Sequence, residues 1–204
     1  MKSIDYSLYL VTDERENFLE IIEEAIKGGV SVVQLRDKTS STKDFYELAM
    51  KVREICYTAD IPLIINDRID IALAIDADGV HIGQDDMPCK VARRIIGNSR
   101  ILGVSASTIE EAIKAESDGA DYIGTGAVFP TSTKDDAPKI TKNDLKSVVE
   151  SVSIPVVAIG GIDLDNVEKL SETGIEGISV VSAIMDSIDP KLASELLKKE
   201  FEKI

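Results

Sequence analysis

The sequence predicts an α/β protein that folds as a single-domain (β/α)8 barrel over residues 1–204. Short apolar runs alternate with amphipathic helical patterns eight times along the chain, at an average spacing of 204/8, or 25.5, residues. Several runs are continuously apolar, as expected of parallel strands that are buried on both faces. Eight successive units suit a closed barrel better than an open doubly wound sheet, and the barrel would be compact, below the ~250 residues typical of the fold.

Each apolar run is interpreted as one strand of the barrel. No low-complexity segment or linker interrupts their succession. The runs are SLYLVT (7–12), SVVQLR (31–36), PLIIND (62–67), GVHIG (79–83), ILGVSAS (101–107), YIGTGAVF (122–129), PVVAIGG (155–161) and GISVVSA (177–183).

Helices are predicted between the runs from apolar residues at helical spacing. The clearest patterns are Phe18, Ile21, Ile22, Ala25 and Ile26, then Phe45, Leu48, Ala49, Val52 and Cys56. Thr108 and Glu111 fit a capping box, and Gly28-Gly29 and Gly119 are plausible helix stops. Later helices are predicted over 141–152, 165–173 and 189–202.

Composition narrows the classes of function. With 23 basic and 37 acidic residues, the net charge is −14, which argues against nucleic acid or an anionic membrane as partner. Cys56 and Cys89 lie 33 positions apart without a CxxC pair, so neither a disulfide framework nor a zinc site is expected. Asp5 breaks any signal-peptide core, and no apolar run approaches the ~20 residues of a membrane span. A cytoplasmic protein acting on small molecules is predicted, with homo-oligomerisation left open.

The second predicted strand ends in Gln34, Leu35, Arg36, Asp37 and Lys38. Chemistry in a (β/α)8 barrel sits at the carboxyl ends of the strands. If Leu35 packs outward on the helices, period-two alternation points Gln34 and Arg36 into the barrel mouth, with Lys38 just beyond. The alternative is that Arg36 lies along the surface or pairs with a neighbouring carboxylate.

Carboxylates follow the third and fourth strands. Asn66-Asp67 ends one, and Asp86 follows the other. Neighbouring strands lie about 4.8 Å apart, so Asp67 and Asp86 can approach each other. Two carboxylates suit Mg²⁺, which keeps several waters and completes its shell with substrate phosphates. The alternative is that Asp67 caps a helix and Asp86 belongs to a turn.

Hydroxyl groups and glycines occupy the remaining strand ends. Ser105 follows strand five, Gly160-Gly161 strand seven and Val181-Ser182 strand eight. Barrels often bind phosphate in the loops after the last two strands, through backbone N–H groups. After strand six, an acidic protein places three hydroxyl residues beside a lysine, a set suited to anions: Thr131, Ser132, Thr133 and Lys134.

His81, the only histidine, lies inside the fourth predicted strand and is given no catalytic role. A lone strand histidine is more often a satisfied core residue than an acid or base. Because it has no evident carboxylate partner, a Ser-His-Asp set and acyl transfer are not expected. The collected groups instead suggest a site for two phosphorylated ligands and a metal.

Six blocks, in this order and spacing, resemble the thiamine-phosphate synthases, also called thiamine-phosphate pyrophosphorylases, over nearly the whole chain. They are VVQLRDK (32–38), IINDRIDIALAIDADGVHIGQDDMP (64–88), ILGVSAS (101–107), GTGAVFPTSTKDDAP (124–138), PVVAIGGI (155–162) and GISVVSAI (177–184). The resemblance implies a (β/α)8 barrel that joins 4-amino-2-methyl-5-(diphosphooxymethyl)pyrimidine to a thiazole phosphate. The products would be thiamine phosphate and diphosphate, with CO2 if the thiazole is carboxylated.

The resemblance also implies roles for single residues. Asp67 and Asp86 match the Mg²⁺ ligands, and Arg36, Lys38 and Lys134 would stabilise the departing diphosphate. The pyrimidine diphosphate would be held by Gln34, Leu35, Arg36, Asp37, Lys38, Asn66, Ser105 and Lys134. The thiazole phosphate would be held by Thr131, Ser132, Thr133, Gly161, Val181 and Ser182.

Two other functions remain open. A thiazole tautomerase uses a similar barrel, but that family carries an acid–base histidine where this chain has Ala127. A non-catalytic phosphate-binding barrel that senses a ligand could use the same cations and carboxylates. Diphosphate release, measured with both substrates and with each alone, would separate the three functions.

Overall fold

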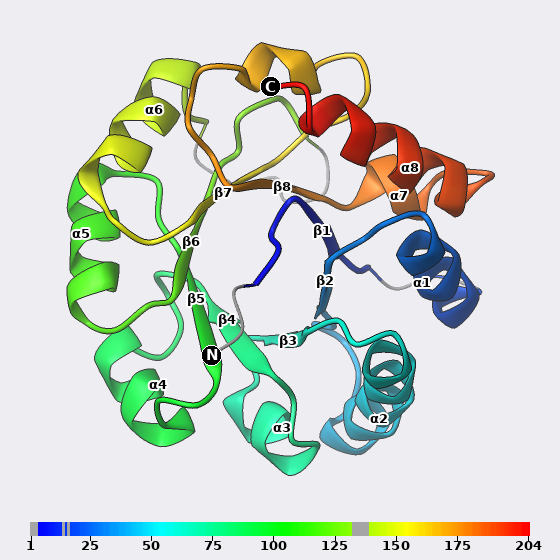
Figure 1. The fold of residues 1–204 in the computed structure, drawn as a ribbon. Coiled ribbons are helices and arrows are strands. Elements are labelled where there is room, and N and C mark those ends of the chain that lie inside the picture. Colours follow the sequence, from blue (N-terminus) through cyan, green and yellow to red (C-terminus); the bar gives the residue numbers. More distant parts are fainter. Residues whose placement is uncertain (1–3, 14, 16, 132–138) are drawn as a thin grey trace.

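Eight parallel strands close into a barrel in chain order, and the helices pack around its outside (Figure 1). The computed structural model describes residues 4–13, 15, 17–131 and 139–204. The strands are β1 (Leu8–Val11), β2 (Val32–Leu35), β3 (Leu63–Asn66), β4 (Gly79–Ile82), β5 (Ile101–Ser105), β6 (Tyr122–Thr125), β7 (Val156–Ile159) and β8 (Gly177–Val180). Each lies inside its predicted run, so the (β/α)8 prediction is confirmed.

Helices connect the strands on the outside of the ring. They are α1 (Phe18–Lys27), α2 (Thr42–Thr58), α3 (Ile69–Ala74), α4 (Cys89–Ile96), α5 (Ile109–Ser117), α6 (Lys142–Ser151), α7 (Ser182–Met185) and α8 (Pro190–Phe201), with a 3-10 helix, η1 (Val167–Leu170). The capping box predicted at Thr108 and Glu111 is present at the start of α5. Gly28 follows the last residue of α1, as predicted for a helix stop.

Two helical segments differ from the prediction. The helix expected over 165–173 is a single 3-10 turn, in which Val167 and Leu170 are the buried residues. Two buried residues three apart need only one such turn to face the barrel. The short helix α7 was predicted as the end of a strand, because four residues are too few to show helical periodicity.

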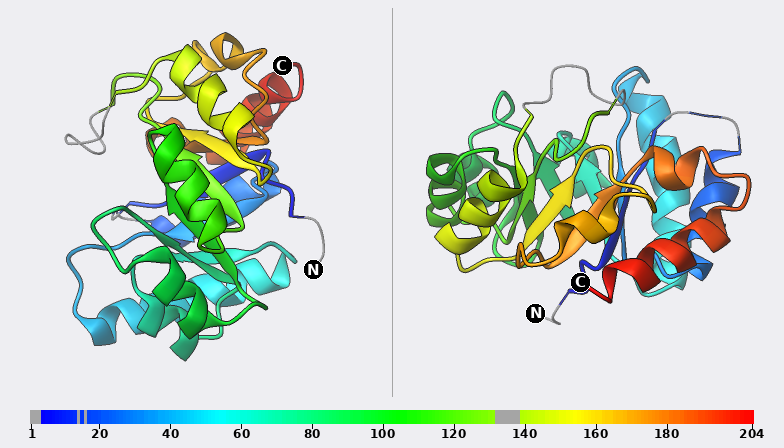
Figure 2. Two further views of the ribbon diagram at one scale, coloured as in Figure 1. Left: turned by 90° about the vertical axis from the view of Figure 1, so that its left-hand side faces the viewer. Right: turned by 90° about the horizontal axis from the view of Figure 1, so that it is seen from above.

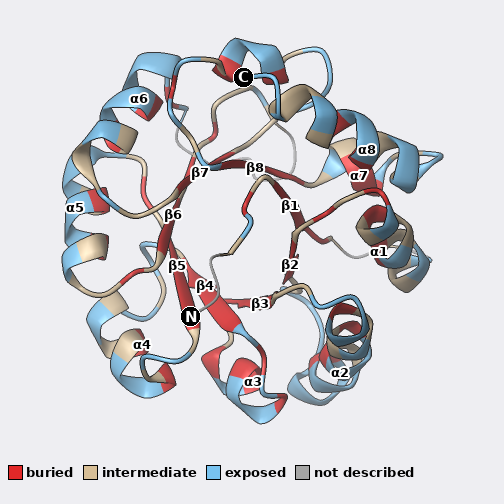
Figure 3. Cartoon of the chain, viewed as in Figure 1, coloured by how far each residue is buried: buried red, intermediate tan, exposed pale blue. Residues whose placement is uncertain are grey.

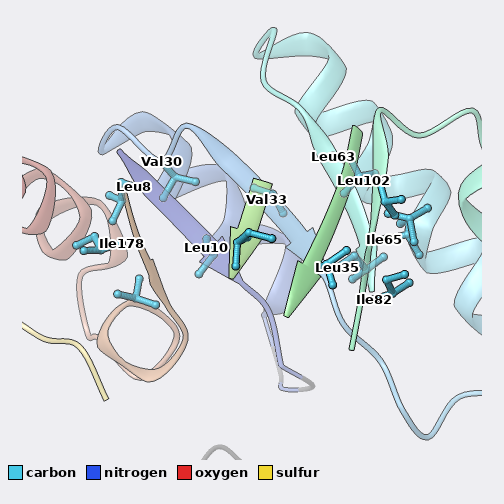
Figure 4. Packing of buried hydrophobic residues seen from close by; sticks show 14 of the residues in the cluster. Leu8, Leu10, Val30, Val33, Leu35, Leu63, Ile65, Ile82, Leu102 and Ile178 are labelled. Carbon is cyan, nitrogen blue, oxygen red and sulfur yellow. The ribbon is translucent and has the colours of Figure 1, made fainter. Parts of the chain in front are cut away.

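Alternation along the strands divides the interior into two cores. The larger lies between strands and helices, and Figure 4 shows part of it, including Leu8, Leu10, Val33, Leu35 and Leu63. The helices turn their buried residues towards the ring and their exposed residues outward (Figure 3). A smaller cluster fills the barrel interior and contains two large, fully buried side chains, Tyr9 and Tyr122.

The ring is closed by pairing between the first and last strands. Leu8 pairs with Ile178 and Tyr9 with Ser179, while Tyr9 also pairs with Val32 on the other side. Every neighbouring pair of strands around the ring is parallel, and Figure 2 shows the barrel from two further sides. All eight carboxyl ends therefore open on the same end of the molecule, where the polar residues of the sequence are brought together.

Candidate active site

A pocket opens at the carboxyl ends of the strands and collects most of the predicted site. Its described walls include eleven of the predicted site residues: Gln34, Arg36, Lys38, Asn66, Asp67, Asp86, Ser105, Thr131, Gly161, Val181 and Ser182. These residues belong to or follow seven of the eight strands, so separate strand ends form one continuous pocket. Three further predicted residues, Ser132, Thr133 and Lys134, lie outside the described residues.

Two predicted residues do not turn their side chains into the pocket. Leu35 is fully buried and packs in the core between strands and helices, as alternation with Gln34 and Arg36 requires. The Asp37 carboxylate accepts hydrogen bonds from the backbone N–H groups of Thr39 and Ser40, at 2.9 Å each. The side chains of Leu35 and Asp37 therefore shape the loop, while those of Gln34, Arg36 and Lys38 face the pocket.

A lysine and two aspartates form one corner of the pocket. The Nζ of Lys38 donates to the Oδ2 of Asp67 at 2.7 Å, which links the loops after β2 and β3. The Oδ2 of Asp86 accepts from the backbone N–H of Gly83 at 2.7 Å. Burial raises the pKa of the Asp86 carboxyl, the neighbouring Asp67 carboxyl raises it further, and the Gly83 N–H partly offsets both.

Asp67 adopts an unusual backbone conformation directly after β3. Its φ is 60°, in the left-handed region that costs most side-chain-bearing residues about 1–2 kcal/mol but that Asp tolerates better. Its backbone N–H donates to the carbonyl oxygen of His81 at 2.8 Å. This turn ends β3 and leaves the carboxylate beside Lys38 and Asp86, so the strain coincides with the most highly charged part of the pocket.

A chain of buried hydrogen bonds forms the floor of the pocket. The Gln34 Nε2 lies 2.8 Å from the Tyr9 hydroxyl, which lies 2.7 Å from the Tyr122 hydroxyl. His81 lies 2.9 Å from the Tyr122 hydroxyl through Nδ1 and 2.9 Å from the Ser105 Oγ through Nε2. Burial is the main cause that raises the pKa of both Tyr9 and Tyr122, so both phenols stay protonated.

Tyr9 and Tyr122 lie before the strand ends and were not predicted as site residues from the sequence. Both occupy inward positions by alternation, since Leu8 and Leu10 on β1, and Ile123 on β6, belong to the helix-facing core. That pattern places their rings inside the barrel. It gives no indication that their hydroxyls meet across it, because this contact depends on the stagger between strands that are not neighbours.

The opposite rim is built from backbone and small side chains. Gly160 and Gly161 have φ values of 100° and 64° at the end of β7. A Cβ on Gly161 would lie 2.3 Å from the carbonyl oxygen of Pro130, so this position requires glycine. The Asn166 side chain donates to the Gly161 carbonyl at 2.8 Å. Ser182 begins α7 in the neighbouring strand end.

One unpaired hydroxyl in the pocket suits a polar ligand. Ser179 lines the pocket from β8 and is 4% exposed, and within the described part of the chain its hydroxyl has no hydrogen-bond partner. Among the same residues no group of three or more His, Cys, Asp or Glu could enclose a metal ion. A cation at Asp67 and Asp86 would therefore have two protein carboxylates at most from this set.

The described helices include none that is both long and apolar enough to cross a bilayer. The fold and the pocket together define a (β/α)8 barrel whose pocket, at the carboxyl ends of the strands, is lined by cationic, carboxylate and hydroxyl side chains.

Comparison with known proteins identifies the family. The family model described as thiamine monophosphate synthase matches residues 8–184. A thiamine-phosphate synthase of Methanobrevibacter smithii is 62% identical over 99% of this chain and 98% of its own length. One of Clostridium acetobutylicum is 57% identical over 92% of this chain and 90% of its own. The chain therefore belongs to the thiamine monophosphate synthase family, as its sequence blocks predicted, and is an enzyme of the transferase class.

Solved structures agree with this result. Thiamine phosphate pyrophosphorylase from Pyrococcus furiosus superimposes with a TM-score of 0.91 and 44% identity, covering 98% of this chain and 96% of that one. A 3-hexulose-6-phosphate synthase matches with a TM-score of 0.73 at 16% identity, which concerns the fold alone.

Proposed function

We propose that this enzyme joins 4-amino-2-methyl-5-(diphosphooxymethyl)pyrimidine to the nitrogen of a thiazole phosphate, releasing thiamine phosphate and diphosphate. CO2 is also released if the thiazole carries a carboxylate. Membership of the family supports this reaction. The observation that carries the proposal is the corner in which Lys38, Asp67 and Asp86 meet, in a pocket that Arg36 also lines.

The aspartate pair fits a bound Mg²⁺. The Asp67 carboxyl raises the pKa of Asp86, and a cation placed beside both carboxylates would offset that repulsion. Mg²⁺ is usually bound through one or two carboxylates plus substrate phosphates, so two aspartates are enough ligands from the protein. When bound by Asp67 and Asp86, Mg²⁺ would neutralise charge on the diphosphate.

The remaining residues act on the substrates directly. Arg36 and Lys38 supply positive charge next to the departing diphosphate, where negative charge grows as the bond to carbon breaks. Lys134, by its place in the sequence, would supply a third charge. The thiazole nitrogen is the nucleophile, so the protein need only hold both substrates and exclude water.

The opposite rim would hold the thiazole phosphate. Backbone N–H groups near Gly161, Val181 and Ser182 can approach a phosphate closely because Gly161 has no side chain and Ser182 begins a helical turn. The predicted hydroxyls Thr131, Ser132 and Thr133 would contribute from the loop after β6.

The rival functions are less well supported. A tautomerase needs an acid–base group after β6, where Ala127 lines the pocket and is 5% exposed. An isomerase also has no use for a carboxylate pair beside two cations. A ligand sensor would bind the same molecules but release no diphosphate.

The test is diphosphate release, measured with both substrates, with each alone, and with and without Mg²⁺. Release only with both substrates and Mg²⁺ supports the proposal, and release of none identifies a binding protein or an isomerase. Asp67→Asn and Asp86→Asn should each lower turnover at least ~100-fold, since even outer-shell changes at metal sites cost ~10–100-fold. Asp85→Asn is the matched control, because Asp85 is exposed in the same loop and does not line the pocket.

A further inference from the structure

The hydrogen-bonded chain below the pocket crosses the barrel from β2 to β5. Its members, in order, are Gln34, Tyr9, Tyr122, His81 and Ser105, joined by contacts of 2.7–2.9 Å. Four of the five are at least nine-tenths buried, and Ser105, at the far end, is half-buried at the pocket wall. The first member is an amide and the last is a hydroxyl that lines the ligand site.

The hydrogen-bonded chain favours one direction of donation, because each side chain has a limited number of protons to donate. The Gln34 nitrogen can only donate, so the Tyr9 oxygen accepts from it. In the direction that this favours, Tyr9 donates its single proton to the Tyr122 hydroxyl, and Tyr122 donates its own to His81 Nδ1. A neutral imidazole that accepts at Nδ1 carries its proton on Nε2, which donates to the Ser105 Oγ. The Ser105 proton is thereby left for a group in the pocket.

The interior is built to keep this geometry. A Cβ on Gly103 would lie 2.1 Å from the Tyr122 Cζ, and one on Gly124 would lie 3.0 Å from the His81 Cε1. β5 and β6 thus carry glycine at the positions where the Tyr122 and His81 rings need space. Tyr6 also packs on the Tyr122 ring, with ring centroids 5.0 Å apart, but its hydroxyl is not a member of the chain.

We propose that Gln34, Tyr9, Tyr122 and His81 are positioning residues that hold Ser105 as a hydrogen-bond donor to the bound substrate. The opposite direction would make His81 Nε2 an acceptor and Ser105 its donor, the arrangement of a serine nucleophile with a histidine base. Donation from Gln34 to Tyr9 favours the first direction, because the Tyr9 proton then has Tyr122 as its acceptor, and the tautomer of His81 distinguishes the two. The part of this inference that concerns turnover rests on the proposed function.

The direction of the hydrogen bonds can be measured without any turnover, because His81 is the only histidine in the protein sequence. Imidazole ¹⁵N spectra of histidine-labelled protein at neutral pH should show one neutral tautomer, protonated at Nε2. Tyr122→Phe removes the donor to Nδ1 and should mix the tautomers, and Tyr9→Phe should do so through Tyr122. Tyr6→Phe should leave the spectrum unchanged. An Nδ1-protonated or doubly protonated ring in the unaltered protein, or an unchanged tautomer in Tyr122→Phe, overturns the proposal.

The proposal also predicts that the effects of Tyr122→Phe and Ser105→Ala on kcat are not additive. Tyr122→Phe should lower kcat roughly 3–10-fold, the effect of one neutral hydrogen bond, and Tyr6→Phe should not. In a Ser105→Ala background, Tyr122→Phe should cost nothing more, because the hydroxyl that it positions is gone. Losses that multiply in the double variant would assign Tyr122 a merely structural role and overturn the proposal. A correct tautomer in a protein that releases no diphosphate would instead count against the proposed function alone.

Discussion

At the scale of single residues, the sequence predicted the charged groups of the pocket better than its floor. Arg36 and Gln34 could be placed by alternation with Leu35, and this prediction is confirmed. Asp86 also belongs to a turn, which was the alternative to a role in the site. Its carboxylate accepts from the Gly83 N–H and still lines the pocket. One carboxylate thus serves both the turn and the site.

The roles predicted for Lys134 and its neighbours stay predictions, because residues 132–138 are not among those described. His81 was expected to be a satisfied core residue, and both of its ring nitrogens are hydrogen-bonded. Its partners could not be foreseen from one strand, because they are contributed by β5 and β6 across the barrel.

Asp86 leads to a prediction about stability and pH. Burial, and next the Asp67 carboxyl, raise its pKa, so the folded protein binds this proton more tightly than the unfolded chain does. Without metal, the free energy of unfolding should fall as pH rises from the ordinary carboxyl pKa, ~3.9, through the raised pKa of folded Asp86. Asp86→Asn removes that charge, and its amide oxygen can still accept from Gly83.

Asp86→Asn should therefore have a higher Tm than the unaltered protein at pH 7 without Mg²⁺, while it loses the rise in Tm that added Mg²⁺ produces. Thermal unfolding with and without Mg²⁺ checks both. A lower Tm in the variant, together with an intact response to Mg²⁺, would contradict the account of this corner. Asp85→Asn again serves as the control.

At the scale of elements, apolar periodicity predicted all eight strands, because a strand that is buried on both faces must be apolar throughout. It failed at η1 and α7, where one turn suffices and no period can develop. It also extended the run 122–129 beyond β6, which ends at Thr125. The backbone N–H groups of Val128 and Phe129 still donate to the end of β7, and their side chains pack against the core, so both residues stay apolar outside the strand.

Strand β5 leads to a prediction about packing. Gly103 faces the Tyr122 ring, and an added Cβ would lie 2.1 Å from its Cζ. Gly103→Ala should therefore cost about 1–3 kcal/mol by overpacking, which corresponds to a fall in Tm of roughly 2–12 °C in a chain of this size. Chemical denaturation measures the cost directly.

The control for Gly103→Ala is the same substitution in a Tyr122→Leu background, where the ring is absent. There the cost should largely disappear, because two residues in contact do not contribute additively. An equal cost in both backgrounds would mean that the glycine is needed for a reason other than the ring.

At the scale of the whole molecule, the site depends on closure of the ring. Tyr9 is held by β2 on one side and by β8 on the other, and the hydroxyl chain needs side chains from five strands. The net charge of −14 opposes anionic ligands at long range. In the proposed function, Arg36 and Lys38 would therefore attract the anionic substrates from within the pocket itself.

The prediction of one domain over residues 1–204 is tested by the cooperativity of unfolding. Strand pairing runs unbroken from β1 to β8 and back to β1, and α1 packs against α8, so no strand can leave without opening the ring. Thermal unfolding should show a single transition, with an enthalpy of about 140 kcal/mol if each residue contributes ~0.7 kcal/mol near 60 °C. Near-ultraviolet circular dichroism, which reports the tyrosines in the barrel, and far-ultraviolet circular dichroism, which reports the helices, should follow the same curve.

Leu8→Ala makes that test stricter. Leu8 is fully buried on β1 at the closing pair with Ile178, and its truncation should cost about 2–5 kcal/mol. If the barrel is one cooperative unit, this change at the closing strand must lower the midpoint of both spectroscopic signals equally, although the tyrosine cluster and most helices are untouched. A tyrosine signal that is lost before the helical signal, in either protein, would show that interior packing and helices are lost in separate steps, and would contradict unfolding as one cooperative unit.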